Sequence, residues 1–211
     1  MKTFDLSLYL VLDPNLCAAY GMVETARAAV EGGATMVQLR DKTGGTERLV
    51  EMGLALKQAL AGTGALLIVN DDIEAAFRIG ADGLHIGQDD GDPAAARARI
   101  GREMILGVSV ETVEAARRLD PAIVDYAGVG PVFATPTKPD HKQPVGLDGL
   151  AALVAASPVR SVAIGGLKGA HVEAVLKTGA EGLAVVSAIC GTVDPRASAQ
   201  LLAALIAEAR R

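Results

Sequence analysis

Two short apolar segments of the chain each end in a turn that carries aspartate residues. Asp71 follows the segment at 66–69, and Asp90 follows the segment at 83–86. If these segments are neighbouring parallel strands, both carboxylates emerge at the same edge of a sheet. Carboxylate oxygens at one edge are what a Mg2+ ion shared with a phosphorylated substrate requires. The spacing therefore predicts a site for a divalent cation and a phosphorylated ligand.

The same aspartates also have simpler interpretations. Asp71 alone is compatible with capping the helix that follows it, because aspartate is a common residue at helix starts. Asp72 is better placed for that cap, which leaves Asp71 to face the centre of the fold. Spacing alone does not decide between Asp89 and Asp90 as the second ligand.

The positions of these aspartates depend on a repeating pattern of apolar strands and helical stretches. Apolar strands are expected at 8–12, 35–39, 66–69, 83–86, 104–108, 123–129, 159–164 and 182–186. Helices are expected at 22–31, 46–60, 73–79, 92–101, 110–119, 147–156, 170–177 and 195–210. Continuous apolar strands separated by helices indicate a parallel sheet that is covered on its faces.

Eight such units predict an α/β fold that closes as a single (β/α)8 TIM barrel over residues 1–211. A doubly wound open sheet is the alternative. The absence of a GxGxxG motif after the first strand weakens it. No linker, low-complexity tract or second domain interrupts the pattern.

Composition excludes several classes of protein. Half of the 211 residues are apolar, which is enough for a large core without disulfides. Aromatic residues make up 3%, tryptophan is absent and the net charge is −5, so no nucleic-acid partner is expected. Any phosphate site must therefore be a local group of donors in an acidic protein.

Neither the N-terminal residues nor the two cysteines are expected to carry a targeting or metal signal. Cys17 and Cys190 lack the spacing of a metal site or a disulfide framework, so both are expected to be buried or to have no specific role. The N-terminal residues do not form a signal peptide, and the apolar runs are too short for a membrane span. A cytoplasmic protein without a membrane partner follows, and assembly into a homo-oligomer stays open.

In a barrel of this kind, the active site lies at the carboxyl ends of the strands. Polar residues gather at those positions: Gln38, Arg40, Lys42, Asn70, Asp71, Gln88, Asp90, Ser109, Thr135, Thr137, Lys138 and Ser187. An ordinary solvated pair is the simpler interpretation of Arg40 and Lys42. Their alternation with Asp41 instead predicts that both point to the same side as Gln38.

A second group of phosphate donors is expected after the seventh and eighth strands. Gly165 and Gly166 are either a simple turn or a backbone nest for a phosphate, a recurrent barrel feature. The segment Thr135–Lys138 adds two hydroxyls and a cation to the same edge. Two basic groups and a nest together predict two phosphorylated ligands, one of them bound to metal.

The three histidines are not expected to be catalytic. His85 lies inside an apolar strand and is interpreted as a core histidine with satisfied hydrogen bonds. His141 and His171 are interpreted as surface residues of a loop and of a helix start.

Seven short motifs together resemble the thiamine-phosphate synthase family. They are QLRDK at 38–42, VNDD at 69–72, ADGLHIGQDD at 81–90, GVS at 107–109, GPVFATPTK at 130–138, IGG at 164–166 and VVSAI at 185–189. Each motif is weak alone, but the ordered set covers nearly the whole chain. The resemblance implies a (β/α)8 barrel that joins 4-amino-5-hydroxymethyl-2-methylpyrimidine diphosphate to 4-methyl-5-(2-phosphoethyl)thiazole, releasing thiamine phosphate and pyrophosphate.

The resemblance also implies roles for individual residues. It makes Asp71 and Asp90 the Mg2+ ligands, and thereby selects Asp90 over Asp89. It places the pyrimidine diphosphate against Gln38, Leu39, Arg40, Asp41, Lys42, Asn70, Ser109 and Lys138. It places the thiazole phosphate against Thr135, Pro136, Thr137, Gly166, Val186 and Ser187. Leu12 departs from the family, which usually has threonine there, so the contribution of the first strand is in doubt.

The implied chemistry is a substitution at a carbon that carries a diphosphate. Mg2+ and the catalytic cations Arg40, Lys42 and Lys138 would stabilise the charge that develops on departing pyrophosphate. The aminopyrimidine can carry the resulting positive charge, which favours a dissociative path. The attacking thiazole nitrogen has no proton to lose, so no general base is required.

Three rival functions remain open at this point. A thiazole tautomerase of a similar barrel needs a proton shuttle, and the aspartate pair argues against it. A Schiff-base aldolase using Lys138 would not need the aspartate pair and would be trapped by borohydride. A non-catalytic sensor of phosphorylated ligands would need no metal, so EDTA would not affect it.

Overall fold

The computed structural model describes residues 3–88, 90–135 and 143–211, and these form a closed barrel of eight parallel strands in the order β1 to β8. Strand β8 pairs with β1 and closes the barrel. The strands are β1 (Leu8–Val11), β2 (Met36–Leu39), β3 (Leu66–Asn70), β4 (Gly83–Ile86), β5 (Ile105–Val110), β6 (Tyr126–Val129), β7 (Arg160–Ala163) and β8 (Gly182–Val185). The (β/α)8 barrel expected from the sequence is confirmed.

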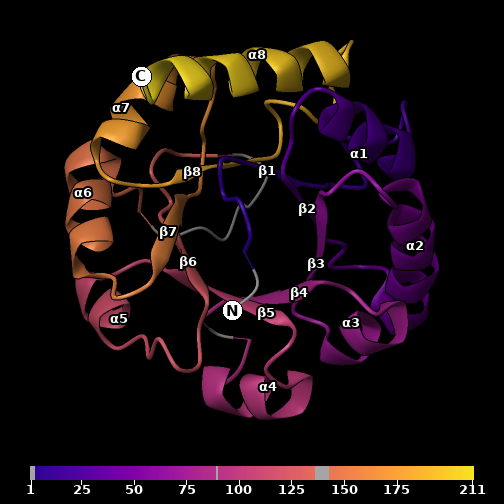
Figure 1. Ribbon diagram of the computed structural model, residues 1–211, viewed down its shortest axis with the longest axis horizontal. Helices are drawn as coiled ribbons and strands as arrows, with labels where there is room; N and C mark the ends of the chain where they lie inside the picture. The colour runs from indigo at the N-terminus through magenta and orange to yellow at the C-terminus, as the bar shows by residue number, and fades with distance from the viewer. Residues whose placement is uncertain (1–2, 89, 136–142) are drawn as a thin grey trace.

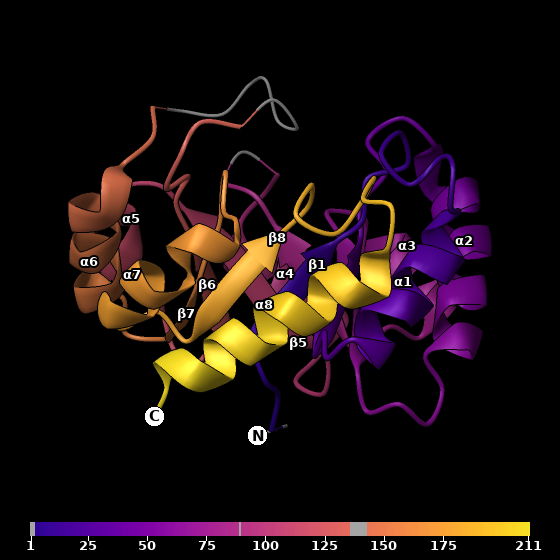
Figure 2. The same ribbon diagram turned by 90° about the horizontal axis from the view of Figure 1, so that it is seen from above.

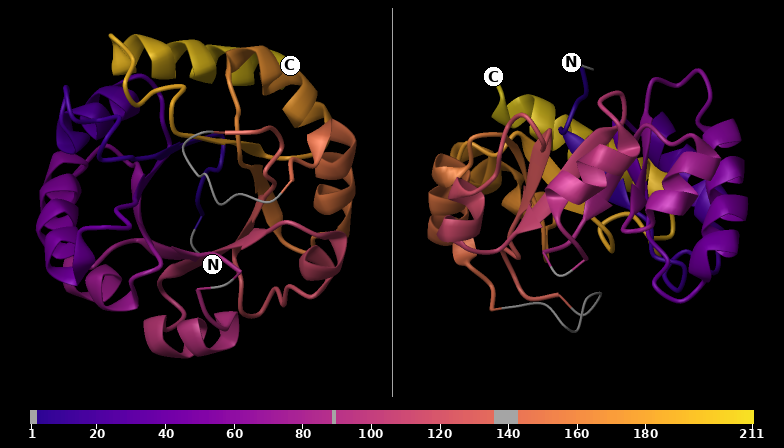
Figure 3. Two further views of the ribbon diagram at one scale, coloured as in Figure 1. Left: turned by 180° about the vertical axis from the view of Figure 1, so that it is seen from behind. Right: turned by 90° about the horizontal axis from the view of Figure 1, so that it is seen from below.

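The helices form a ring around the strands (Figure 1). They are α1 (Met22–Glu31), α2 (Gly45–Ala59), α3 (Ile73–Ile79), α4 (Pro93–Ile100), α5 (Val113–Arg117), α6 (Gly146–Ala156), α7 (Val172–Lys177) and α8 (Pro195–Ala209), with a 3-10 helix η1 (Gly169–His171) before α7. Figure 3 shows the same ring from the opposite end. None of the helices in the described part of the chain has the length and apolarity to cross a membrane.

The two ends of the barrel differ. In Figure 2 the C-terminus and the segment leading into β1 lie at the end where the strands begin. Phe4, in that segment, packs against the Tyr126 ring with 5.9 Å between ring centroids. The arrow of β8 points to the other end, where the loops that follow the strands gather. The end at which the strands finish is therefore the one available for a binding site.

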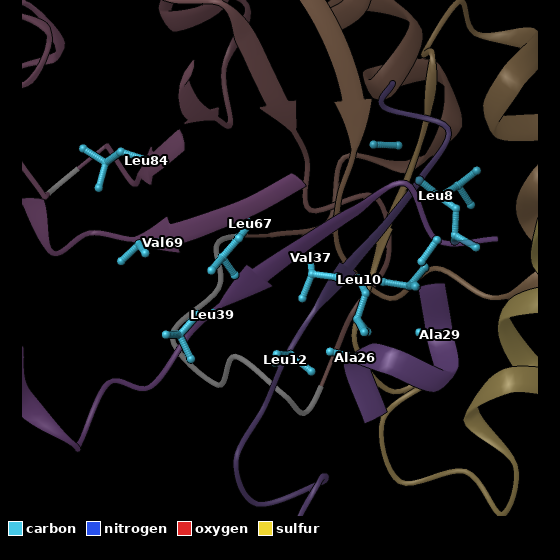
Figure 4. Packing of buried hydrophobic residues seen from close by; sticks show 14 of the residues in the cluster. Leu8, Leu10, Leu12, Ala26, Ala29, Val37, Leu39, Leu67, Val69 and Leu84 are labelled. Atoms are coloured by element: carbon cyan, nitrogen blue, oxygen red, sulfur yellow. The ribbon is translucent and has the colours of Figure 1, made fainter. Parts of the chain in front are cut away.

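Strand residues alternate between two apolar layers. The outward residues, including Leu8, Leu10 and Leu12, share one buried cluster with Ala26 and Ala29 of α1 (Figure 4). The inward residues form a smaller cluster inside the barrel, with Tyr9, Met36, Ile68, Tyr126 and Val162 among its members. Because alternate residues face inward, a polar residue at an inward position near a strand end reaches the barrel mouth.

Two predicted boundaries are wrong in the middle of the chain. The helix expected at 110–119 is shorter, because Val110 pairs with Val129 in the sheet and Thr112 caps α5 by accepting a hydrogen bond from the Ala115 amide. The strand expected from residue 123 begins at Tyr126, since Ile123 belongs to a turn in which its amide donates to the Asp120 carbonyl. The apolar residue Ile123 therefore lies in a turn and not in a strand.

Candidate active site

A pocket lies at the carboxyl ends of the strands and collects most of the residues singled out from the sequence. Those that line it are Gln38, Arg40, Lys42, Asn70, Asp71, Asp90, Ser109, Thr135, Gly166, Val186 and Ser187. They come from every part of the barrel, from β2 round to the loop after β8. The predicted location of the site therefore coincides with a pocket in the structure.

Leu39 and Asp41 alternate away from the pocket. The Leu39 side chain is fully buried and belongs to the same apolar cluster as Leu10 and Leu12 (Figure 4). The Asp41 carboxylate accepts hydrogen bonds from the Thr43 and Gly44 amides and pairs with Arg48 at 3.2 Å. Gln38, Arg40 and Lys42 do line the pocket, so the predicted alternation is confirmed. The predicted residues Pro136, Thr137 and Lys138, with Asp89 and His141, lie outside the described residues.

Asp71 and Asp90 lie close together at the pocket with Lys42 between them. Lys42 Nζ is 2.6 Å from Asp71 Oδ2 and 3.7 Å from Asp90 Oδ1. The register of β3 on β4 produces this arrangement, because Asn70 pairs with His85 and the Asp71 amide donates to the His85 carbonyl. We call Arg40, Lys42, Asp71 and Asp90 the charged side of the pocket.

The Asp71 backbone and side chain are held in an unusual state. Asp71 has a φ of 61°, a left-handed conformation that aspartate and asparagine tolerate better than most residues. Its helix-capping alternative is wrong, since Asp72 caps α3 by accepting from the Ala75 amide at 2.8 Å. Burial raises the pKa of Asp71, and the nearby Asp90 charge adds to that rise while Lys42 opposes it. The ionised form of the Asp71 carboxylate is therefore less stable here than it would be in water.

The charged side fits a hard divalent cation. Asp71 Oδ1 is buried and has no hydrogen-bond partner among the described residues, which is costly unless something binds it. No cluster of three or more metal-ligating side chains occurs in the described ranges. Two carboxylates alone suit Mg2+, which is usually held by one or two carboxylates together with water and substrate phosphates.

The opposite side of the pocket is built from glycine backbone. Gly165 and Gly166 follow β7 with φ angles of 92° and 66°. A Cβ on Gly166 would lie 2.7 Å from the Ala134 carbonyl oxygen, so the tight approach of two loops requires glycine. Ser187, after β8, faces the same space.

Lys168 is a polar residue of this region that the sequence did not reveal. Its Nζ donates a hydrogen bond of 2.8 Å to Ser187 Oγ. Lys168 lies in an exposed loop two residues beyond the glycines, and only that spacing from Gly166 would have drawn attention to it. We call Gly165, Gly166 and Ser187, together with Lys168 that bonds to Ser187, the glycine side of the pocket.

The histidines largely match their predicted roles. His85 is 7% exposed, and its two ring nitrogens bond to Tyr126 OH and Ser109 Oγ, so the prediction of a satisfied core histidine is confirmed. The ring nevertheless lines the pocket. His171 is half-buried in η1, and its ring packs on Phe133 with 4.4 Å between centroids. Cys17 and Cys190 are both buried and free, as expected.

The fold and the polar pocket at the strand ends define the class of (β/α)8-barrel enzymes. The family model of thiamine monophosphate synthase matches residues 8–189. Thiamine-phosphate synthase of Xanthobacter autotrophicus is 49% identical over 209 residues, covering 99% of each chain. That of Psychrobacter sp. is 47% identical over 204 residues, covering 94% of each chain.

A solved structure agrees with these sequence matches. Thiamine phosphate pyrophosphorylase from Pyrococcus furiosus superposes with a TM-score of 0.87 at 35% identity, covering 97% of this chain and 96% of the other. The chain belongs to the thiamine monophosphate synthase family, and it is a transferase of thiamine biosynthesis. The family resemblance expected from the seven motifs is confirmed.

Proposed function

We propose that the protein joins 4-amino-5-hydroxymethyl-2-methylpyrimidine diphosphate to 4-methyl-5-(2-phosphoethyl)thiazole. The bond between the exocyclic carbon and the diphosphate oxygen breaks, and a bond from that carbon to the thiazole nitrogen forms. The nitrogen lone pair supplies the electrons and pyrophosphate leaves with the electrons of the broken bond. The observation that carries this proposal is the pair Asp71 and Asp90 beside Lys42, with Asp71 Oδ1 unpaired among the described residues.

The charged side is suited to the departing diphosphate. Asp71 and Asp90 would hold Mg2+, whose positive charge would offset the negative charge of the diphosphate oxygens. Arg40 is half-buried at the pocket and forms no ion pair with another described residue, so its guanidinium is available for two diphosphate oxygens. Although partial burial opposes it, the bond to Asp71 raises the pKa of Lys42, which therefore stays charged. Lys138 is predicted to add a third cation from outside the described residues.

The glycine side is suited to the phosphate of the thiazole, which does not react. Backbone amides in a left-handed turn commonly donate hydrogen bonds to anions, and these amides carry no net charge. Lys168 and the Ser187 hydroxyl add one cation and one hydroxyl donor. A phosphate held there is an anchor that positions the thiazole nitrogen for attack.

The proposed reaction needs no general base, and the hydrogen bonding of His85 is consistent with this. Both of its ring nitrogens are already bonded to Tyr126 and Ser109. This arrangement disfavours the tautomerase alternative, since that reaction requires a residue that moves a proton.

Pyrophosphate release tests the proposal directly. With both substrates and Mg2+ present, we expect stoichiometric pyrophosphate and thiamine phosphate, and with either substrate alone we expect neither product. EDTA should stop the reaction, whereas a sensor would bind its ligands without turnover. Borohydride should not trap either substrate on the protein, and trapping at Lys138 would favour the aldolase. No pyrophosphate from the complete mixture would contradict the proposed function.

A further inference from the structure

A buried network of four hydrogen bonds crosses the inside of the barrel beneath the pocket. Gln38 Nε2 donates to Tyr9 OH at 2.8 Å, and Tyr9 OH lies 3.0 Å from Tyr126 OH. Tyr126 OH is 2.9 Å from His85 Nδ1, and His85 Nε2 is 2.9 Å from Ser109 Oγ. The four residues other than Ser109 are at most 7% exposed. We call these five residues the buried network.

Two glycines of the barrel strands leave the space that the rings of this network occupy. A Cβ on Gly107 of β5 would overlap the Tyr126 ring, and a Cβ on Gly128 of β6 would lie 3.1 Å from His85 Cε1. Two of the chain's three tyrosines belong to the network, while most other inward residues are apolar. Polar groups inside an apolar core destabilise the fold unless every one is bonded, so apolar residues would be the simpler filling.

With the Gln38 amide oriented as in this structure, the network has only one direction in which every buried proton lies between two partners. The Gln38 amide N–H can only donate, so Tyr9 OH accepts from it. The Tyr9 proton then has Tyr126 OH as its acceptor, and the Tyr126 proton has His85 Nδ1. Burial raises the pKa of both tyrosines, which keeps both phenols protonated.

This direction determines what the two ends of the network present to the pocket. In this direction His85 Nδ1 accepts, so the ring proton lies on Nε2 and is donated to Ser109 Oγ. The Ser109 hydroxyl proton is thereby turned outward as a donor to the pocket. At the other end, Gln38 also lines the pocket, and its amide oxygen can only accept a hydrogen bond.

We propose that Tyr126, together with Tyr9 and His85, acts as a positioning residue that fixes the direction of the Ser109 hydroxyl and so selects an aminopyrimidine over its 4-oxo analogue. An aminopyrimidine offers ring-nitrogen lone pairs to the Ser109 donor and an amino group to the Gln38 acceptor. The 4-oxo analogue replaces the amino donor with a carbonyl acceptor and carries a proton on a ring nitrogen. Buried polar groups left unpaired by the wrong ligand give strong discrimination. This inference rests on the proposed function, because that function supplies the pyrimidine.

The test compares the binding of two ligands, the aminopyrimidine diphosphate and its 4-oxo analogue, by calorimetry with Mg2+ and without the thiazole. We expect the wild type to prefer the amino compound by about 100-fold. Tyr126→Phe keeps the ring but removes the central hydroxyl, which frees His85 to change tautomer. The preference should fall about tenfold in that variant, while the KM for the thiazole phosphate stays the same.

Two control variants separate positioning from stability. Tyr20→Phe makes the same change on a residue that is 50% exposed and outside the network, and it should leave the preference unchanged. Phe4→Leu disturbs the ring that packs on Tyr126 without removing a network hydrogen bond, so it should lower Tm and keep the preference. If Phe4→Leu lowers the preference as much as Tyr126→Phe does, packing is the cause and the inference is overturned.

A measurement on the unmodified protein covers the case in which Tyr126→Phe does not fold. Nitrogen-15 NMR of the histidine rings should show His85 protonated at Nε2 and not at Nδ1. The opposite tautomer, or equal binding of both pyrimidines by a wild type that releases pyrophosphate, would overturn the inference and leave the proposed function standing. A wild type that releases no pyrophosphate would overturn both.

Discussion

Under the proposed function, the two sides of the pocket would bind anions by different means. The charged side uses side chains, with Lys42 Nζ 2.6 Å from Asp71 and the two carboxylates close together. The glycine side uses backbone turned into the left-handed region at Gly165 and Gly166. Ionised groups and a metal stabilise charge that develops during a reaction, whereas neutral amides are sufficient for a phosphate whose charge stays constant. Under the proposed function, this difference assigns the departing diphosphate to the charged side and the unreactive phosphate to the glycine side.

The largest effect is expected from removing a carboxylate on the charged side. Asp71→Asn keeps a residue that tolerates φ of 61°, so the fold should remain while kcat falls on the order of 10^2–10^3-fold. Asp90→Asn should behave similarly in steady-state assays at low Mg2+. Asp92→Asn is the control, because asparagine caps α4 as well as aspartate does.

A variant of Asp89 tests whether Asp90 is the second metal ligand. Asp89→Asn should have a milder effect than Asp90→Asn in the same assay. An equal loss would mean that Asp89 is the ligand, and full activity of Asp71→Asn at low Mg2+ would refute the metal site.

A smaller effect is expected at Arg40, where the geometry of the cation is tested. Arg40→Lys retains the charge but loses the two-pronged contact with diphosphate oxygens. Both kcat and kcat/KM should fall by about 2–3 kcal/mol in transition-state stabilisation. A substrate with a better leaving group than diphosphate should recover part of that loss. A rise in KM with unchanged kcat would show that Arg40 only binds the substrate.

On the glycine side, Gly166→Ala should act on one substrate only. The added Cβ would meet the Ala134 carbonyl oxygen and strain a φ of 66°. We expect the KM for the thiazole phosphate to rise on the order of tenfold, since a single hydrogen bond to a charged group contributes about 1.5–3 kcal/mol. The KM for the pyrimidine diphosphate should not change. Equal effects on both substrates would remove the distinction between the two sides.

The smallest effects are expected at Ser187 and Lys168. Ser187→Ala and Lys168→Met should each raise the KM for the thiazole phosphate by a few-fold, because each removes one donor that is at least partly open to solvent. Lys177→Met is the matched control, since Lys177 is an exposed lysine of α7 paired with Glu173. If the Lys177 variant has the same effect, general surface charge and not the Lys168 contact is responsible.

Much of the fold and the site followed from short-range patterns in the sequence. Parallel strand ends meet at one edge, so two apolar segments predicted an aspartate pair there, and the family resemblance selected Asp90 over Asp89 as the partner of Asp71. Alternation along a strand end distinguished the pocket residues Arg40 and Lys42 from Asp41. Helix starts were equally local, as the Asp72 and Asp92 caps show.

The features that the sequence did not reveal depend on distant contacts. The bond between Tyr9 and Tyr126 joins residues 117 positions apart and requires the registers of several strands. Lys168 is exposed, and its role depends on how the loops after β7 and β8 approach each other. The end of β5 at Val110 was also missed, because pairing with β6 overrode local helical spacing.

The direct test of the difference between the two sides is calorimetric binding of pyrophosphate and of the thiazole phosphate, each with and without Mg2+. For the wild type, pyrophosphate binding should require Mg2+ and thiazole phosphate binding should not. Asp71→Asn should lose the Mg2+-dependent binding of pyrophosphate, and Gly166→Ala should retain it. Mg2+-dependent pyrophosphate binding that survives in Asp71→Asn, or thiazole phosphate binding that requires Mg2+, would contradict the assignment of the metal and the reacting diphosphate to the charged side.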